Sequence, residues 1–452
     1  MAYVYGLFGI PGGNVKVVAA PARERDTDTI WALLRADRVV VDNTIVGAGT
    51  LVAGALGVAF QSIVSHTLRP TDFGSVFAVM SVITLIGLPA TAFTLLMARE
   101  ASRSRATGRW ASSRALLWQC NQTLLILGAA IGIAMFVLAG PIGELIGAPI
   151  AMLLAAAAGI PFALALPVLL GEFQGEQRFV AYAALAVGQA ALKLAGAVLV
   201  GAIIGPVGVI VGVSGTAALI YAIGLLLLRQ ELRARPRLSW WRQSSPYLMI
   251  VIPSTLALAA LLNTDILFVK HFFPSSDAGR YAAVAALGRA IFWASSGVAT
   301  VLFPKVVFRG AKGLGTSRLV GLSLALVAVG GLIGIVLLAS GSRWLLTLFA
   351  GAAYADAATY VLGYSIGMIL LGCAAVLIAS LQSRGRPQFL AVLIPLAAVE
   401  PVLLTIFHDS LWQVVKAVDV SMGLVVVGLS AVYLAQSRAP AVRPATIDSR
   451  TN

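Results

Sequence analysis

Charged residues, cysteine and histidine are all scarce in this chain of 452 residues. Asp, Glu, Lys and Arg make up 11% of it, whereas soluble globular proteins hold about 25%. The two cysteines, Cys120 and Cys373, lie far apart in apolar segments, with no metal-ligand spacing and no paired framework. We therefore expect no soluble domain, no disulfide scaffold and no metal site.

Apolar residues are abundant instead, at 59% of the chain, with a mean hydropathy of +0.94. Many lie in runs long enough to cross about 30 Å of hydrocarbon as a helix. The sequence predicts an all-α polytopic membrane protein with twelve spans, near residues 43–66, 73–97, 115–139, 151–171, 180–204, 208–228, 247–270, 279–303, 319–340, 358–381, 389–407 and 412–435.

One stretch occurs twice. Residues 61–79 align without gaps on residues 266–284, and the matches include a His, an Asp and a Gly: His66 with His271, Asp72 with Asp277, and Gly74 with Gly279. The offset is 205 residues, so we interpret it as an internal duplication. Six spans per half is an even number, which predicts two parallel repeats of the kind found in transporters. We expect the two glycines to permit tight turns rather than to contact a ligand.

Basic residues predict the orientation. If the N-terminus is cytoplasmic, the inner segments hold 25 Lys and Arg, against four in the outer loops: Arg69, Lys270, Arg280 and Arg343. This bias predicts that both termini are cytoplasmic. It also explains the net charge of +14 through contacts with anionic lipid headgroups, so we expect membrane lipids and no nucleic acid as partners.

The expected organisation has five parts. Residues 1–42 form a cytoplasmic extension with a possible amphipathic helix, 43–229 a first lobe and 230–246 a cytoplasmic linker. Residues 247–435 form a second lobe, and 436–452 a disordered tail.

The outer loops are mostly short, and the longest, 341–357, is hydrophobic. This argues against an enzyme, because catalysis on a polar substrate needs acidic and basic groups gathered in one place.

Polar residues inside the spans are the candidate site. Each costs about 2.5 to 3.5 kcal/mol to insert at the bilayer centre, so each should face a bundle interior or a wet cavity. The candidates for substrate binding are Lys193, Arg289, Gln189, Asn263 and Thr264. Asp265 and Glu400 are candidates for H⁺ or Na⁺ coupling or for ion pairing with the two basic residues. The basic residues thus predict either an ion pair that joins helices or a positive cavity for an anionic substrate. Prolines inside spans favour bent helices.

The two repeated hairpins share a motif of Pro, an acidic residue, Gly and an aromatic residue: Pro70, Asp72, Gly74 and Phe77, and again Pro274, Asp277, Gly279 and Tyr281. This motif resembles the outer hairpin of the polysaccharide-biosynthesis flippases, the oligosaccharide branch of the superfamily that includes the multidrug and toxin extrusion antiporters. That family's Leu-Phe-Gly with a following Tyr resembles Leu348, Phe349, Gly351 and Tyr354, with one residue inserted. Its Gln-Gly and Arg-Phe resemble Gln174, Gly175, Arg178 and Phe179.

The resemblance covers residues 43–435 and implies two six-helix lobes around a central cavity. It also implies export of a polyprenyl-diphosphate-linked oligosaccharide across the bacterial inner membrane, alongside polymerase and glycosyltransferase partners. A diphosphate needs positive groups at mid-depth, for which Lys193 and Arg289 are suited. Sugar hydroxyls would need neutral partners such as Asn263, Thr264 and Gln189.

Three alternatives stay open. A multidrug or cation antiporter of the same architecture would need an acidic ion site, which Asp265 could supply, although Lys193 and Arg289 would repel a cationic drug. A membrane glycan polymerase or ligase is disfavoured by the short outer loops. A peptidoglycan-precursor flippase is disfavoured because residues 43–66 hold no Lys or Arg and the chain has twelve expected spans.

Overall fold

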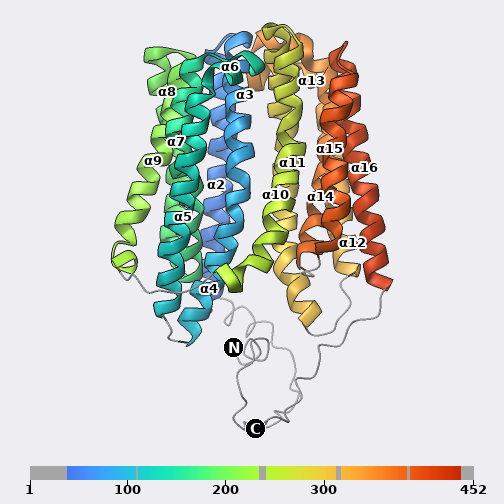
Figure 1. Ribbon diagram of the computed structural model, residues 1–452. Helices are drawn as coiled ribbons and strands as arrows, with labels where there is room; N and C mark the ends of the chain where they lie inside the picture. Colours follow the sequence, from blue (N-terminus) through green and yellow to red (C-terminus); the bar gives the residue numbers. More distant parts are fainter. Residues whose placement is uncertain (1–37, 108–109, 234–240, 312–316, 384–386, 439–452) are drawn as a thin grey trace, which may run out of the picture.

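The computed structural model is a bundle of long helices that run roughly parallel to one another (Figure 1). It describes residues 38–107, 110–233, 241–311, 317–383 and 387–438, and those residues include no strand. The prediction of an all-α polytopic membrane protein is confirmed. The amphipathic helix predicted within residues 1–42 lies largely outside the described residues, as does most of the predicted tail.

Each of the twelve predicted spans contains a long helix in the described chain. They are α2 (Arg38–Thr67), α3 (Pro70–Gly87) continued by α4 (Thr91–Thr107), α5 (Trp110–Val137), α7 (Ile150–Gly175), α8 (Phe179–Ile204), α9 (Pro206–Leu227), α10 (Trp241–Phe272), α11 (Ser275–Ala311), α12 (Ser317–Ala339), α14 (Ala358–Ser383), α15 (Leu390–Ile406) and α16 (Leu411–Arg438). Eleven segments of the described chain are long and apolar enough to cross a membrane. The remaining helix, α11, carries three charged residues in its first half.

Two predicted loops contain short helices. These are α6 (Ala139–Ile146) and α13 (Ser342–Ala350), the latter followed by the 3₁₀ helix η4 (Ala352–Ala357). Figure 1 shows α6 and α13 at the same end of the bundle. We call this end the hairpin face, because it also carries the α2–α3 and α10–α11 turns.

The helices pack into two bundles that follow the halves of the chain. Among the first set, α7 contacts α4, α5 and α9, and α8 contacts α2 and α9; in the second, α14 contacts α11, α12 and α16. We call these the N-lobe and the C-lobe. The main contacts between them join α3 to α10 and α11.

Small residues allow the close approach of helices within the N-lobe. A Cβ on Gly171 of α7 would lie 2.8 Å from Met97 Cβ of α4, and Gly196 of α8 faces Gly212 of α9 across a backbone contact. Membrane helices associate through such small-residue contacts because the lipid supplies no hydrophobic drive between them. Pro89 separates α3 from α4 with the short 3₁₀ helix η2 (Leu88–Ala90), as its lack of an N–H predicts.

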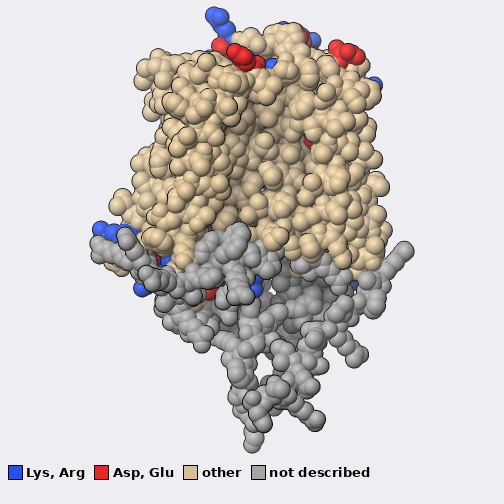
Figure 2. All heavy atoms as spheres, in the orientation of Figure 1, with Lys and Arg blue, Asp and Glu red and all other residues tan. Residues whose placement is uncertain are grey.

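The surface between the two ends of the bundle is apolar. Figure 2 shows charged side chains at both ends and an almost uncharged band between them. Helix α12 contributes large exposed side chains to this band, such as Leu322, which is 67% exposed. An apolar surface of this extent is expected of a protein that lipid surrounds.

The repeated glycines do not lie in the tight turns that the sequence predicted. Gly74 and Gly279 both lie within helices, α3 and α11, and neither has the positive φ that a tight turn would exploit. The prediction that they permit turns is wrong. They lie against each other instead, because a Cβ on Gly74 would come within 3.0 Å of the backbone of Gly279.

Candidate functional site

A buried polar cluster lies inside the C-lobe. We call it the C-lobe polar network; its members are Asn263 and Asp265 on α10, Tyr281 and Arg289 on α11, and Tyr364 on α14. Arg289 Nη2 lies 3.0 Å from Asp265 Oδ1. The hydroxyls of Tyr364 and Tyr281 donate to Asp265 Oδ2 at 2.9 and 3.1 Å. Asp265 therefore has both a counter-charge and two hydroxyl donors.

Arg289 distributes its donors over the same network. Its Nε donates to the Tyr364 hydroxyl at 3.2 Å, and its Nη1 to Asn263 Oδ1 at 3.4 Å. The guanidinium also lies 5.2 Å from the centre of the Phe77 ring, which belongs to α3 of the N-lobe. Arg289 is 6% exposed. Of the two roles that the sequence left open for Arg289, the geometry matches the ion pair that joins helices.

Glu400 is a second buried acid of the C-lobe. It lies on α15, which packs against α10 and α16, and its side chain is fully buried. Neither carboxyl oxygen has a hydrogen-bond partner among the described residues. Asp265 and Arg289 lie near enough to act on it electrostatically.

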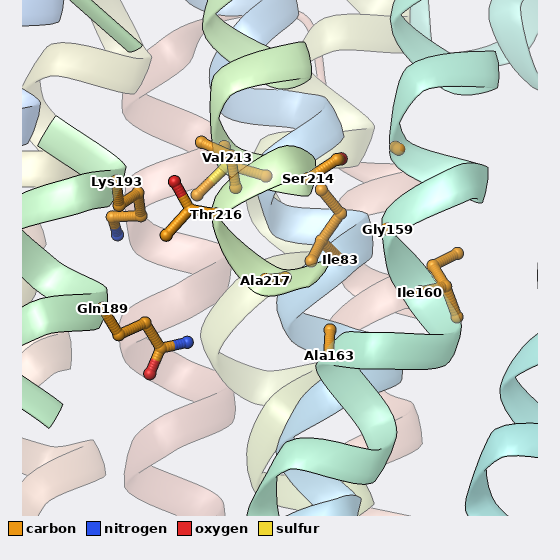
Figure 3. A pocket seen from close by; sticks show the side chains of 12 residues that line it. Ile83, Gly159, Ile160, Ala163, Gln189, Lys193, Val213, Ser214, Thr216 and Ala217 are labelled. Atoms are coloured by element: carbon orange, nitrogen blue, oxygen red, sulfur yellow. The ribbon is translucent and has the colours of Figure 1, made fainter. Parts of the chain in front are cut away.

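A cavity of about 170 Å³ lies inside the N-lobe. Lys193 and Gln189 line it from α8, while Ser214 and Thr216 line it from α9, and apolar side chains of α3 and α7 complete the walls. Figure 3 shows Lys193 and Gln189 one turn apart on the same helix, both beside this cavity. The Lys193 ammonium lies 4.4 Å from the centre of the Phe60 ring. Within the described chain Lys193 forms no ion pair.

The structure does not bring all predicted site residues together. Lys193 and Gln189 share the N-lobe cavity, whereas Arg289, Asn263 and Asp265 belong to the C-lobe polar network. Thr264 donates to Ala260 of its own helix at 2.8 Å instead of joining the network. Lys416 and Asp419, three residues apart on α16, form no ion pair with each other, and Asp419 Oδ1 has no hydrogen-bond partner among the described residues.

Neither tyrosine of the network was predicted from the sequence as a site residue. Tyr281 was predicted only as the aromatic residue of the hairpin motif. One signal was available: a tyrosine inside an apolar span brings a hydroxyl that needs a partner when buried.

Among the described residues, no group of three or more His, Cys, Asp or Glu is placed to hold a metal ion.

Comparison with known proteins identifies the fold. No protein-family model and no curated protein sequence matches the chain. Solved structures do match, among them an inward-facing multidrug resistance transporter of the MATE family in the MOP superfamily, with a TM-score of 0.67 at 14% identity over 86% of this chain and 96% of that one.

Two further matches broaden the picture. The lipid II flippase MurJ, in an inward closed conformation, gives a TM-score of 0.64 at 12% identity over 86% of this chain and 87% of that one. The eukaryotic MATE transporter AtDTX14 gives 0.63 at 12% identity over 89% and 98%. At these identities the likeness concerns the fold. The chain is a multi-pass membrane protein with the fold of the MOP-superfamily transporters and flippases.

Proposed function

We propose that this protein is an alternating-access flippase that moves a polyprenyl-diphosphate-linked oligosaccharide across the bacterial inner membrane for surface polysaccharide synthesis, with both termini cytoplasmic. The fold supports transport of some cargo, because solved proteins of this architecture include both a multidrug resistance transporter and a lipid II flippase. Membrane lipids and enzymes of glycan synthesis are the partners that this function requires.

The proposal of an anionic cargo rests on Lys193. It is a cation at mid-span that faces an apolar-walled cavity, and no acidic side chain among the described residues neutralises it. A phosphate group that leaves water needs such a charge-assisted donor. Gln189, Ser214 and Thr216 place neutral hydrogen-bonding groups in the same cavity.

The size of the cavity limits what it can hold. Whole small-molecule sites typically measure about 300 to 1,000 Å³, whereas this cavity measures about 170 Å³. It therefore suits one phosphate or one sugar ring of a larger cargo. We assign anion recognition to Lys193 alone, because Asp265 already neutralises Arg289.

Coupling to an H⁺ or Na⁺ gradient would use the acids of the C-lobe. Asp265 is committed to Arg289, which leaves Glu400 as the carboxyl whose charge can change during a cycle. The same acid is the observation that favours the second candidate function, a multidrug or cation antiporter. The two candidates differ in the charge of the cargo.

A reconstituted flipping assay tests the proposal. The purified protein in vesicles receives a fluorescent polyprenyl-diphosphate oligosaccharide, and its transfer is followed by an impermeant quencher. We expect K193A to lower the initial rate at least tenfold and K193R to retain part of it. K416A is the matched control, because Lys416 is exposed on α16. A wild-type rate in K193A, or extrusion of ethidium without transfer of the lipid, would overturn the proposal.

A further inference from the structure

The duplicated hairpins meet each other at the hairpin face. Gly74 of the N-lobe lies against the backbone of Gly279 of the C-lobe, and a Cβ on Gly279 would overlap the carbonyl group of Pro70. The glycine matched in the repeat is thus the point where the backbones of the two lobes touch. Any larger side chain at Gly279 requires the lobes to separate there.

The C-lobe reaches across to the N-lobe hairpin with α13 and η4. The Tyr354 hydroxyl of η4 donates to the carbonyl oxygen of Leu68 at 3.3 Å, just beyond the end of α2. Ser65 Oγ of α2 lies 3.3 Å from the carbonyl oxygen of Phe349 in α13, and 2.8 Å from that of Ser62 in its own helix, so its one hydroxyl hydrogen is shared between the two. These contacts join the loop helix of one lobe to the hairpin of the other.

The N-lobe reaches across in the same way with α6. A ring nitrogen of His271, at the end of α10, lies 2.7 Å from the carbonyl oxygen of Leu145 in α6. Lys270 is 5% exposed, and its Cε would lie 3.4 Å from a Cβ placed on Gly147. The end of the C-lobe hairpin is therefore covered by N-lobe residues.

The two crossings are equivalent under the duplication. His66 and His271 occupy matching positions, and each lies against the segment that ends the opposite loop helix. Those segments each contain a glycine with positive φ, 55° at Gly147 and 107° at Gly351. Their separation of 204 residues agrees with the offset of the repeat to within one residue.

We propose that this reciprocal crossing is the gate that closes the transport pathway at the hairpin face, and that α6 and α13 must leave the opposite hairpins together when it opens. We call it the outer gate. The described contacts between the lobes here include hydrogen bonds, close backbone packing and an edge contact between the rings of Phe73 and Tyr354, whose centres are 5.8 Å apart. Such contacts can break and re-form. The outer gate rests on two parts of the proposed function, alternating access and cytoplasmic termini, and not on the identity of the cargo.

A cysteine pair across the outer gate tests the closed contact. In a background with Cys120 and Cys373 replaced by Ser, the pair S65C and F349C joins the two lobes. The pair D409C and Q413C is the control, because it lies within one lobe on the hairpin face, with an Asp409 oxygen 3.3 Å from a Gln413 nitrogen. We expect both pairs to cross-link under mild oxidation in membranes.

A glycine substitution then perturbs the gate. G279A should lower the yield of the S65C–F349C cross-link at least threefold and leave the control pair unchanged. G140A in α6 is the matched substitution, since nothing lies within 4 Å of a Cβ at Gly140. We expect G140A to change neither yield. An undiminished S65C–F349C yield in G279A would overturn the proposal.

Reagent access supplies the second measurement. K270C places a shorter side chain where Lys270 is covered by the other lobe, and an impermeant maleimide is added to intact cells. G279A should raise its labelling rate at least threefold, and the S65C–F349C cross-link should lower it. If the G279A variant does not accumulate in the membrane, the cross-link alone tests the proposal. A labelling rate of K270C that is the same with and without the S65C–F349C cross-link would then overturn it. Neither measurement involves cargo, so the outer gate and the proposed cargo can fail separately.

Discussion

Replacing Arg289 tests whether the C-lobe polar network holds the C-lobe together. In R289M the apolar side chain keeps roughly the length of the original, but Asp265 loses its counter-charge at 3.0 Å. The two tyrosine hydroxyls remain as donors to Asp265 Oδ2. Asp265 is 1% exposed, so water cannot replace the guanidinium without opening the bundle.

The expected loss is large for one substitution. Removing one partner from a buried ion pair typically costs about 3 to 5 kcal/mol, because an uncompensated charge stays behind. We therefore expect R289M to lower the free energy of unfolding in mixed micelles by about 3 kcal/mol or more. In the double variant R289M/D265N the buried charge is gone, so most of the loss should be recovered.

A second ion pair on the same helix provides the control. Arg280 and Asp277 of α11 lie 3.3 Å apart with side chains 39% exposed, and exposed pairs contribute about 0 to 1 kcal/mol. R280M should therefore change the unfolding free energy by less than about 1 kcal/mol. An R289M variant that unfolds like the wild type, or an R289M/D265N variant no more stable than R289M, would show that Arg289 does not stabilise the C-lobe by pairing with Asp265.

Two more variants test burial and helix packing. E400M should raise the free energy of unfolding by about 1 to 3 kcal/mol, because it removes a buried carboxyl without hydrogen-bond partners, and it should abolish any pH dependence of transport. The control E144Q, which changes an exposed acid, should do neither. A loss of stability in E400M would show that Glu400 has a partner. G171A should lower the free energy of unfolding by about 1 to 3 kcal/mol, because its Cβ would crowd Met97. The control G215A should not, because the space around its Cβ is open. Equal thermal unfolding of the two variants in detergent would contradict this packing.

The sequence predicted the spans well because a membrane helix is marked by length and apolarity, which need no knowledge of neighbours. Pro89 even marked where the second span breaks. The partners of buried charges were harder to predict. Counted from the turn near residues 273–274, Asp265 and Arg289 differ in depth by about seven residues, roughly 10 Å along ideal helices. Their pairing depends on the long arginine side chain, which residue spacing does not encode.

The two lobes differ most where the duplication would place equivalent residues. At the 205-residue offset Phe60 matches Asp265, and Lys193 on the fifth long helix of its half corresponds closely to Glu400 on the fifth of the other. In the N-lobe this pair of positions holds a cation above an aromatic ring; in the C-lobe it holds two acids, one neutralised by Arg289. The symmetric residues meet at the hairpin face. Among the described residues, the asymmetric ones leave Lys193 without an ion pair in the N-lobe and Glu400 without a hydrogen-bond partner in the C-lobe. In the proposed function the anion binds in the N-lobe and the proton in the C-lobe, so one rocking motion about the outer gate would couple the two sites.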